Sequence, residues 1–275
     1  MLTILSGLMT SFSYATSDLM SQRVTRATGP VTQVVWMLAS GVAIILPVAF
    51  VVEGLPEGGE WRGAGLAALA GAIYFAALFC LLRGLQVGDL GLISALTSLQ
   101  GAYAAAAVVA LGEPLTPALG IALALCAVGA VLTSFEGRAR STRGAPWALA
   151  AGLLFAGVML CYAYGDIDWL SQAAISRTVS LVVALPVALL SGDVTVPRGL
   201  RRWAVGGGIL ELSGLVLLTV TFALGPATTA SVTTTQFGTF AVVLGFVLLH
   251  ERPRPNQWVG IVATITGVTL LAVVG

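Results

Sequence analysis

The chain has 275 residues, of which 57% are hydrophobic and only 9% are charged, and its formal net charge is +1. A soluble domain usually carries about 25% charged residues. This composition therefore excludes an ordinary soluble globule and indicates an integral membrane protein, whereas the near-neutral charge says nothing about partners.

Ten apolar stretches follow one another along the chain, each close to the roughly 20 residues that a helix needs to cross the hydrocarbon core. They cover residues 2–22, 30–52, 63–84, 89–111, 117–135, 146–164, 169–190, 203–224, 227–249 and 256–274. Glycine, proline and charged residues separate them. The sequence therefore predicts ten transmembrane helices with short connections and no soluble domain.

The basic residues are unevenly placed, and all 13 of them are arginines. Eleven lie at or within alternate connections between the stretches: Arg23, Arg26, Arg83, Arg138, Arg140, Arg143, Arg198, Arg201, Arg202, Arg252 and Arg254. The opposite set of connections holds only Arg62. Because arginine-rich connections tend to stay in the cytoplasm, we expect both chain termini on the outer side.

The two halves of the sequence are related to each other. A displacement of 138 residues pairs residues 111–117 with 249–255, and a displacement of 137 pairs residues 101–104 with 238–241. Each half would hold five helices, and an odd number inserts the second half upside down. We therefore expect an all-α integral membrane protein in which ten transmembrane helices form two inverted five-helix repeats, residues 1–137 and 138–275, around a central cavity.

Each half ends with a helix, a short turn containing glutamate and proline, and a glycine-rich helix, over residues 111–133 and 249–271. This pattern resembles the EamA repeat of the drug/metabolite transporter superfamily. Two copies of the repeat would cover nearly the whole chain. The resemblance implies a ten-helix carrier that exports small metabolites, often amino acids, without ATP, and the YddG-type aromatic amino-acid exporters are one branch. Two features depart from it: Leu99 and Gln100 stand where the family often has proline, and many relatives keep their termini inside.

Three charged residues lie inside the predicted helices, where a charge costs about 2.5 kcal/mol or more. Arg177 and Glu211 each lie about eight residues, or roughly 12 Å, from opposite ends of neighbouring spans. At this common depth they could form a structural ion pair, or Glu211 could titrate as a substrate or proton site. Asp18 precedes Arg23 by only a few residues, so we expect it near the membrane surface.

Polar side chains on several helices are candidates to bind a substrate. Glu211 is displaced by 137 residues from Tyr74, so both are expected to face the cavity. Hydroxyl and amide groups could form hydrogen bonds with the ammonium and carboxylate groups of a zwitterion, and tyrosine rings could stack on its apolar side chain. Serine and threonine also form hydrogen bonds between membrane helices, so packing alone is the alternative for each hydroxyl. The substrate-binding candidates are Tyr14, Ser17, Tyr74, Ser94, Ser98, Gln100, Tyr103, Tyr162, Glu211, Thr234 and Gln236.

The sequence contains no P-loop, HExxH or GxSxG motif, so neither ATP-driven pumping nor the common hydrolases have support. The three cysteines lie in apolar stretches and His250 is the single histidine, so we expect no disulfide, no metal, no cofactor and no catalytic residues.

The predicted function is secondary active export of small metabolites, most of all amino acids, by alternating access across a bacterial cytoplasmic (inner) membrane. The expected partners are the lipid bilayer, a small-molecule substrate and protons as a candidate coupling ion, with no nucleic acid. The alternative is a membrane-embedded enzyme acting on a lipid. Such an enzyme needs clustered acids, for which Asp166 and Asp168 are the nearest candidates.

Overall fold

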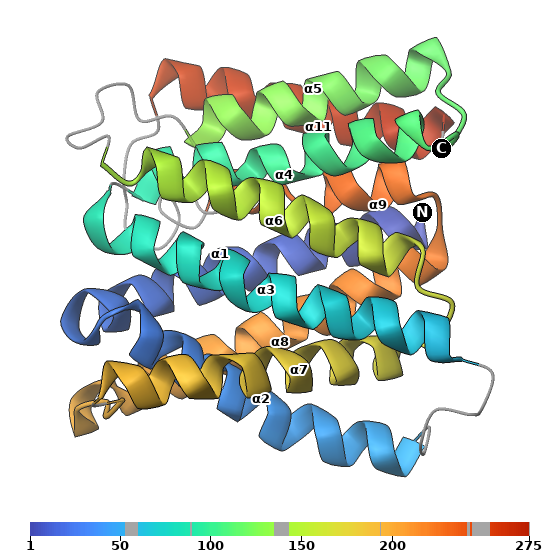
Figure 1. Cartoon of the computed structure of the whole chain (residues 1–275). Coiled ribbons are helices and arrows are strands. Elements are labelled where there is room, and N and C mark those ends of the chain that lie inside the picture. The colour runs from blue at the N-terminus through green and yellow to red at the C-terminus, as the bar shows by residue number, and fades with distance from the viewer. Residues whose placement is uncertain are drawn as a thin grey trace.

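The computed structural model describes residues 1–52, 60–88, 90–134, 143–192, 194–240, 243 and 254–274. Within these ranges all regular secondary structure is helical (Figure 1). The helices are α1 (Leu2–Thr28), α2 (Pro30–Val52), α3 (Trp61–Val87), α4 (Leu90–Ala110), α5 (Pro117–Ser134), α6 (Ala145–Ala163), α7 (Trp169–Ser191), the short 3₁₀ helix η1 (Arg198–Leu200), α8 (Arg201–Leu224), α9 (Ala227–Thr233) and α11 (Pro255–Val274).

Several of these helices can cross a membrane by length and composition alone. Five apolar segments of sufficient length occur in the described part of the chain: Pro30–Val52, Trp61–Val87, Ala145–Ala163, Trp169–Ser191 and Arg198–Leu224. The bounds predicted for the second to eighth and for the tenth apolar stretch agree with the helices to within a few residues. The all-helical, membrane-spanning prediction is therefore confirmed at this level.

The first predicted stretch was too short. The predicted stretch ends at residue 22, but α1 continues past Arg23 and Arg26 to Thr28. The guanidinium of Arg23 lies 5.1 Å from the ring centroid of Trp203 at the start of α8. A long basic side chain can extend along an aromatic surface while its charge stays at the membrane edge, so charge does not end the helix there.

The ninth predicted stretch differs as well, because it was expected to be one helix over residues 227–249. Within the described residues α9 ends at Thr233, residues 234–236 form a turn, and helix resumes at Phe237. The hydroxyls of Thr233 and Thr234 each donate to a carbonyl one turn earlier, at 2.8 Å. Such back-bonding competes with the helical ladder and often bends a helix.

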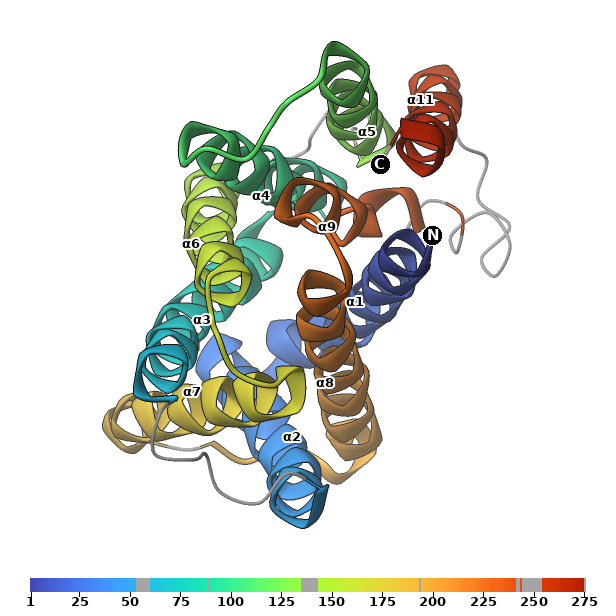
Figure 2. The same cartoon turned by 90° about the vertical axis from the view of Figure 1, so that its right-hand side faces the viewer.

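The helices form a bundle in which the first half of the chain packs mainly on the second half (Figure 2). α1 packs on α8 and α9, and in the reciprocal arrangement α6 packs on α3 and α4. α2 likewise packs on α7 and α8, α7 packs on α3, and α5 packs on α11. Exchanging α1 to α5 for α6, α7, α8, α9 and α11 in that order thus reproduces this set of contacts.

Small residues allow the close approach between the halves. A Cβ atom on Gly71 of α3 would collide with the backbone carbonyl of Ser176 in α7. In the same contact the Ser180 hydroxyl donates to the Gly71 carbonyl at 2.6 Å. Membrane helices associate through small residues and such short polar contacts, because lipid provides no hydrophobic force between them.

The glutamate of the repeated turn also joins the two halves. Glu113, between α4 and α5, accepts hydrogen bonds from the Thr228 hydroxyl at 3.0 Å and from the Thr228 backbone N–H at 3.3 Å. A carboxylate at a helix N-terminus satisfies unpaired N–H groups and is favoured by the helix dipole. Its counterpart Glu251 lies outside the described residues.

Both chain termini lie at one end of the bundle (Figure 1). The connections from α1 to α2, from α3 to α4 and from α7 to α8 lie at the opposite end. The arginines of these three connections therefore share one end of the molecule, and the residues that begin and finish the chain share the other.

Candidate functional site

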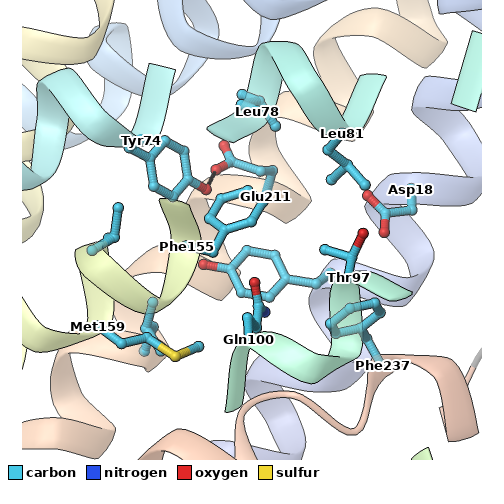
Figure 3. Close-up of a pocket in the computed structure, with 13 residues that line it drawn as sticks. Asp18, Tyr74, Leu78, Leu81, Thr97, Gln100, Phe155, Met159, Glu211 and Phe237 are labelled. Atoms are coloured by element: carbon cyan, nitrogen blue, oxygen red, sulfur yellow. Dashed lines mark hydrogen bonds between the residues drawn. The ribbon is translucent and has the colours of Figure 1, made fainter. Parts of the chain in front are cut away.

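A cavity lies between α1, α3, α4, α6, α8 and the segment that follows the turn after α9 (Figure 3). About 40 Å³ of it is open to the centre of a water molecule, which is room for a few waters. Thirteen residues line it: Tyr14, Asp18, Tyr74, Leu78, Leu81, Thr97, Gln100, Phe155, Val158, Met159, Glu211, Leu218 and Phe237.

Glu211 is held from two sides in the wall of this cavity. The Tyr74 hydroxyl of α3 donates to Glu211 Oε1, and the Arg177 guanidinium of α7 pairs with Glu211 Oε2. All three side chains are almost completely buried, with 0% to 3% of their surfaces exposed. The ion pair that the sequence suggested is therefore present, and the same carboxylate also contacts Tyr74, the repeat-related residue that was expected only to face the cavity.

The guanidinium of Arg177 lies behind the cavity rather than in its wall. A Cβ on Gly41 of α2 would collide with the Arg177 Nε atom, so glycine at this position makes room for the side chain. The neighbouring Ser176 shares a 2.6 Å hydrogen bond with the Tyr162 hydroxyl of α6. Arg177 is thus close to α2 and α8, and its contact with the lining includes Glu211.

The structure shows a contact of Asp18 that the sequence did not predict. We expected this residue near the membrane surface, and it lies ten residues, or about 15 Å, before the end of α1 at Thr28. Asp18 lines the cavity one helical turn after Tyr14. Unlike Glu211, it forms no ion pair and no hydrogen bond with any residue that the structure describes.

Helix α4 presents one polar face to the cavity. Thr97 and Gln100, three residues apart, both line it, with 1% and 5% of their surfaces exposed. Within the described part of the chain, Thr97 Oγ1 and Gln100 Oε1 have no hydrogen-bond partner. The side chain of Ser94 is outside the described residues.

The other α4 candidates do not line the cavity. Ser98 is buried, and Tyr103 is half-buried against the main hydrophobic core. Neither belongs to the cavity wall.

The candidates in the second half have other partners. The Thr234 hydroxyl donates to the Ala230 carbonyl at 2.8 Å. The Gln236 side-chain amide donates to the Val232 carbonyl at 3.0 Å and, more weakly, to Cys126 of α5 at 3.5 Å. Both side chains therefore stabilise the interrupted segment and its packing, and neither lines the cavity.

Two further candidates tie helices together instead of lining the cavity. Ser17 of α1 donates to the Gly207 carbonyl of α8 at 2.8 Å. Tyr162 is occupied by its bond to Ser176. The alternative of helix packing, which the sequence left open for each hydroxyl, describes the contacts of these side chains.

Eight lining residues were absent from the sequence-based set: Leu78, Leu81, Thr97, Phe155, Val158, Met159, Leu218 and Phe237. Some carried a usable signal. Thr97 lies on the same helix face as Gln100. Phe155 and Met159 share a face at a spacing of four. Phe237 is displaced from Gln100 by the same 137 residues that separate Tyr74 from Glu211.

The apolar helices, which are long enough to cross a membrane, define the class as a multi-pass membrane protein, with a partly polar cavity between the two halves of the bundle. The sequence profile described as the EamA-like transporter family matches residues 1–135 and again residues 142–273. The chain therefore belongs to the EamA-like transporter family, within the drug/metabolite transporter superfamily, and contains two EamA repeats. Members of this family are membrane transporters of small molecules, which is consistent with the expectation that the protein is not an enzyme.

A solved structure described only as "Crystal structure of protein" has the same fold. It superposes with a TM-score of 0.77 at 15% sequence identity, over 98% of this chain and 96% of that one. No curated protein matches the sequence. The likeness to the solved structure extends to the fold alone.

Proposed function

We propose that this transporter is a secondary active carrier that exports small amphiphilic metabolites, amino acids with aromatic or other apolar side chains first among them. The cavity carries this proposal. It lies between the two repeats and combines two carboxylates, Asp18 and Glu211, with the rings of Phe155 and Phe237. Ligand sites are typically mostly apolar with a few polar groups that fix orientation.

The proposed architecture is ten membrane crossings in two inverted five-helix repeats, residues 1–137 and 138–275, that rock around the cavity in alternating access. Repeat-related positions support it. Tyr74 and Glu211 are 137 residues apart and touch, and Leu81 and Leu218, at the same displacement, line the same cavity. Carriers built in this way hold substrate near the membrane midplane where the repeats meet.

The proposed location is a bacterial cytoplasmic membrane with the arginine-bearing end inside. Single cysteines introduced at positions 57 and 140, both outside the described residues, test the orientation. With a membrane-impermeant thiol reagent in intact cells, position 57 should react and position 140 should not. The opposite labelling would reverse the orientation and place both termini in the cytoplasm.

Counterflow in proteoliposomes tests the function directly. Vesicles loaded with an unlabelled amino acid should accumulate the same labelled amino acid only when they contain the protein. Across a panel of amino acids, the rate of counterflow should be higher for those with more apolar side chains. Protons are the proposed coupling ion, so an imposed proton gradient should drive net uptake. Absence of counterflow for every member of the panel would exclude amino-acid transport.

A matched substitution tests the role of Glu211 in coupling. Glu211→Gln should abolish the response to the proton gradient if this carboxylate titrates during transport. Unchanged rates and an unchanged dependence on pH would instead leave Glu211 with a purely structural role beside Arg177.

A further inference from the structure

The two repeats contribute very different side chains to the cavity. From the first repeat, five of the seven lining residues are polar: Tyr14, Asp18, Tyr74, Thr97 and Gln100. From the second repeat, Glu211 is the single polar residue, and the other five are apolar: Phe155, Val158, Met159, Leu218 and Phe237. Figure 3 shows Asp18 and Thr97 on one side of the opening and Met159 on the other.

The charge of the lining is also one-sided. Glu211 is neutralised by Arg177, which lies behind the wall. Asp18 has no such partner among the described residues, and no arginine is part of the lining. Among the described residues, Asp18 is therefore the acidic group of the lining that has no compensating partner, and when ionised it attracts a cation and repels an anion in a poorly solvated space.

Two further oxygens lie in the same lining. Thr97 Oγ1 and Gln100 Oε1 are almost completely buried, and within the described part of the chain neither has a hydrogen-bond partner. Buried polar atoms are nearly always hydrogen-bonded, so these two oxygens point to a ligand with N–H or O–H donors. A primary ammonium group has three N–H donors and no acceptor, which matches one carboxylate and two neutral acceptors.

We propose that the cavity binds a primary ammonium group. Asp18 supplies the charge, Thr97 Oγ1 and Gln100 Oε1 accept two of the N–H groups, and the apolar part of the substrate packs on Phe155 and Met159. The substrate class is therefore an amphiphilic amine. This inference rests on the proposed function only in taking the cavity as the substrate site.

Three ligands that differ only in their head group test the proposal: phenethylamine, the neutral 2-phenylethanol and the anionic 3-phenylpropionate. Calorimetric titration of the full-length protein in detergent should show phenethylamine binding more tightly than 2-phenylethanol by at least about tenfold, the scale of a hydrogen-bonded charge. 3-Phenylpropionate should bind more weakly than both. Equal affinity for the three ligands, or a preference for the anion, would overturn the proposal.

Substitutions at Asp18 assign the preference to this residue. Asp18→Asn should remove the preference for phenethylamine and leave the affinity for 2-phenylethanol intact, which shows that the cavity still forms. Asp18→Glu should restore part of the preference. The matched control is Asp168→Asn, at an exposed residue before α7, and it should behave as the wild type. Retention of the full amine preference in Asp18→Asn would contradict the assignment.

The binding and transport experiments together distinguish failure of the proposed amine site from failure of the proposed function. An amine preference that depends on Asp18 without counterflow would support the site and remove the proposed function. Counterflow of amino acids with an amine affinity that does not change in Asp18→Asn would keep the transporter and remove the site.

Discussion

The first and second EamA repeats supply related positions to one cavity, but most of the lining residues of the first repeat are polar and most of those of the second are apolar. Gln100 of α4 corresponds to Phe237 after α9, and Tyr74 of α3 corresponds to Glu211 of α8, at the same displacement in sequence. Within the described part of the chain, Thr97 and Gln100 of the first repeat face the cavity without a hydrogen-bond partner for their side-chain oxygens, whereas Glu211 is already bound by Arg177 and Tyr74. A symmetric scaffold thus encloses an asymmetric site, as an amphiphilic substrate with two different ends requires.

The same contrast appears in the backbones of α4 and α9. α4 is continuous from Leu90 to Ala110, and its Thr97 faces the cavity. α9 is interrupted after Thr233, and the hydroxyl of Thr234, the counterpart of Thr97, bonds within its own helix. Equivalent hydroxyl residues therefore have different surroundings, so a stripe of hydroxyl residues alone does not identify a substrate site.

The largest expected effect comes from removing the charge compensation in the second repeat. Arg177→Ala should destabilise the protein by about 3–5 kcal/mol, because it leaves the buried carboxylate of Glu211 without a partner. The double substitution Arg177→Ala with Glu211→Ala should recover much of this loss. The measurement is the midpoint of thermal unfolding in detergent. An unchanged midpoint in the single variant would show that the charge of Glu211 is not held by Arg177, and the contrast between the repeats would fail.

The interruption after α9 should be the next most sensitive feature. The Ser11 hydroxyl of α1 donates to the Thr233 carbonyl and accepts from the Gln236 N–H, both at 2.9 Å. Ser11→Ala removes both bonds in a buried place, so we expect a loss of about 2–3 kcal/mol. Ser213→Ala is the control, because that exposed hydroxyl bonds only within α8. Equal midpoints for the two variants would mean that Ser11 does not support the interruption.

A smaller effect is expected where the repeats touch. Tyr74→Phe removes the hydroxyl that donates to Glu211 and keeps the edge-to-face contact with Phe155, whose ring centroid is 5.5 Å away. The expected loss is about 1.5 kcal/mol, the lower range for a hydrogen bond to a charged group. Unfolding of Tyr164→Phe, an exposed tyrosine, gives the baseline. A loss no larger than this baseline would show that Arg177 alone fixes Glu211.

Much of the scaffold could be predicted from the sequence, because it depends on quantities that run along the chain. The lengths of the apolar stretches predicted most helix bounds. The fixed rise per residue predicted that Arg177 and Glu211 lie at the same depth along their helices. The repeat displacement then paired Tyr74 with Glu211. Both predictions use distances along one helix or between equivalent positions of the two repeats. Neither kind of distance depends on how each helix is rotated about its own axis.

The rotation of each helix about its axis could not be predicted. Ser17 faces α8 and Thr97 faces the cavity because of packing between segments far apart in sequence. That Asp18 lines the cavity was not predicted either, because it depends on how α1 packs against α3 and α8. The interruption after Thr233 was missed because that segment has no proline or glycine at the break, and because Ser11, which hydrogen-bonds to its backbone, comes from a distant helix.

The smallest effects test the comparison between the repeats most directly, because Thr97 and Thr234 are equivalent residues. Threonine and valine have nearly the same shape, and we expect each buried Thr→Val change to alter stability by about 1 kcal/mol or less, the scale of one hydrogen bond. Thr97→Val should weaken phenethylamine binding by about three- to tenfold, since one acceptor for the ammonium group is lost. Thr234→Val should leave the affinity unchanged, because its hydroxyl bonds to the Ala230 carbonyl. Equal losses of affinity would mean that both repeats bind the polar end of the substrate, and the asymmetry inferred from the lining would be wrong.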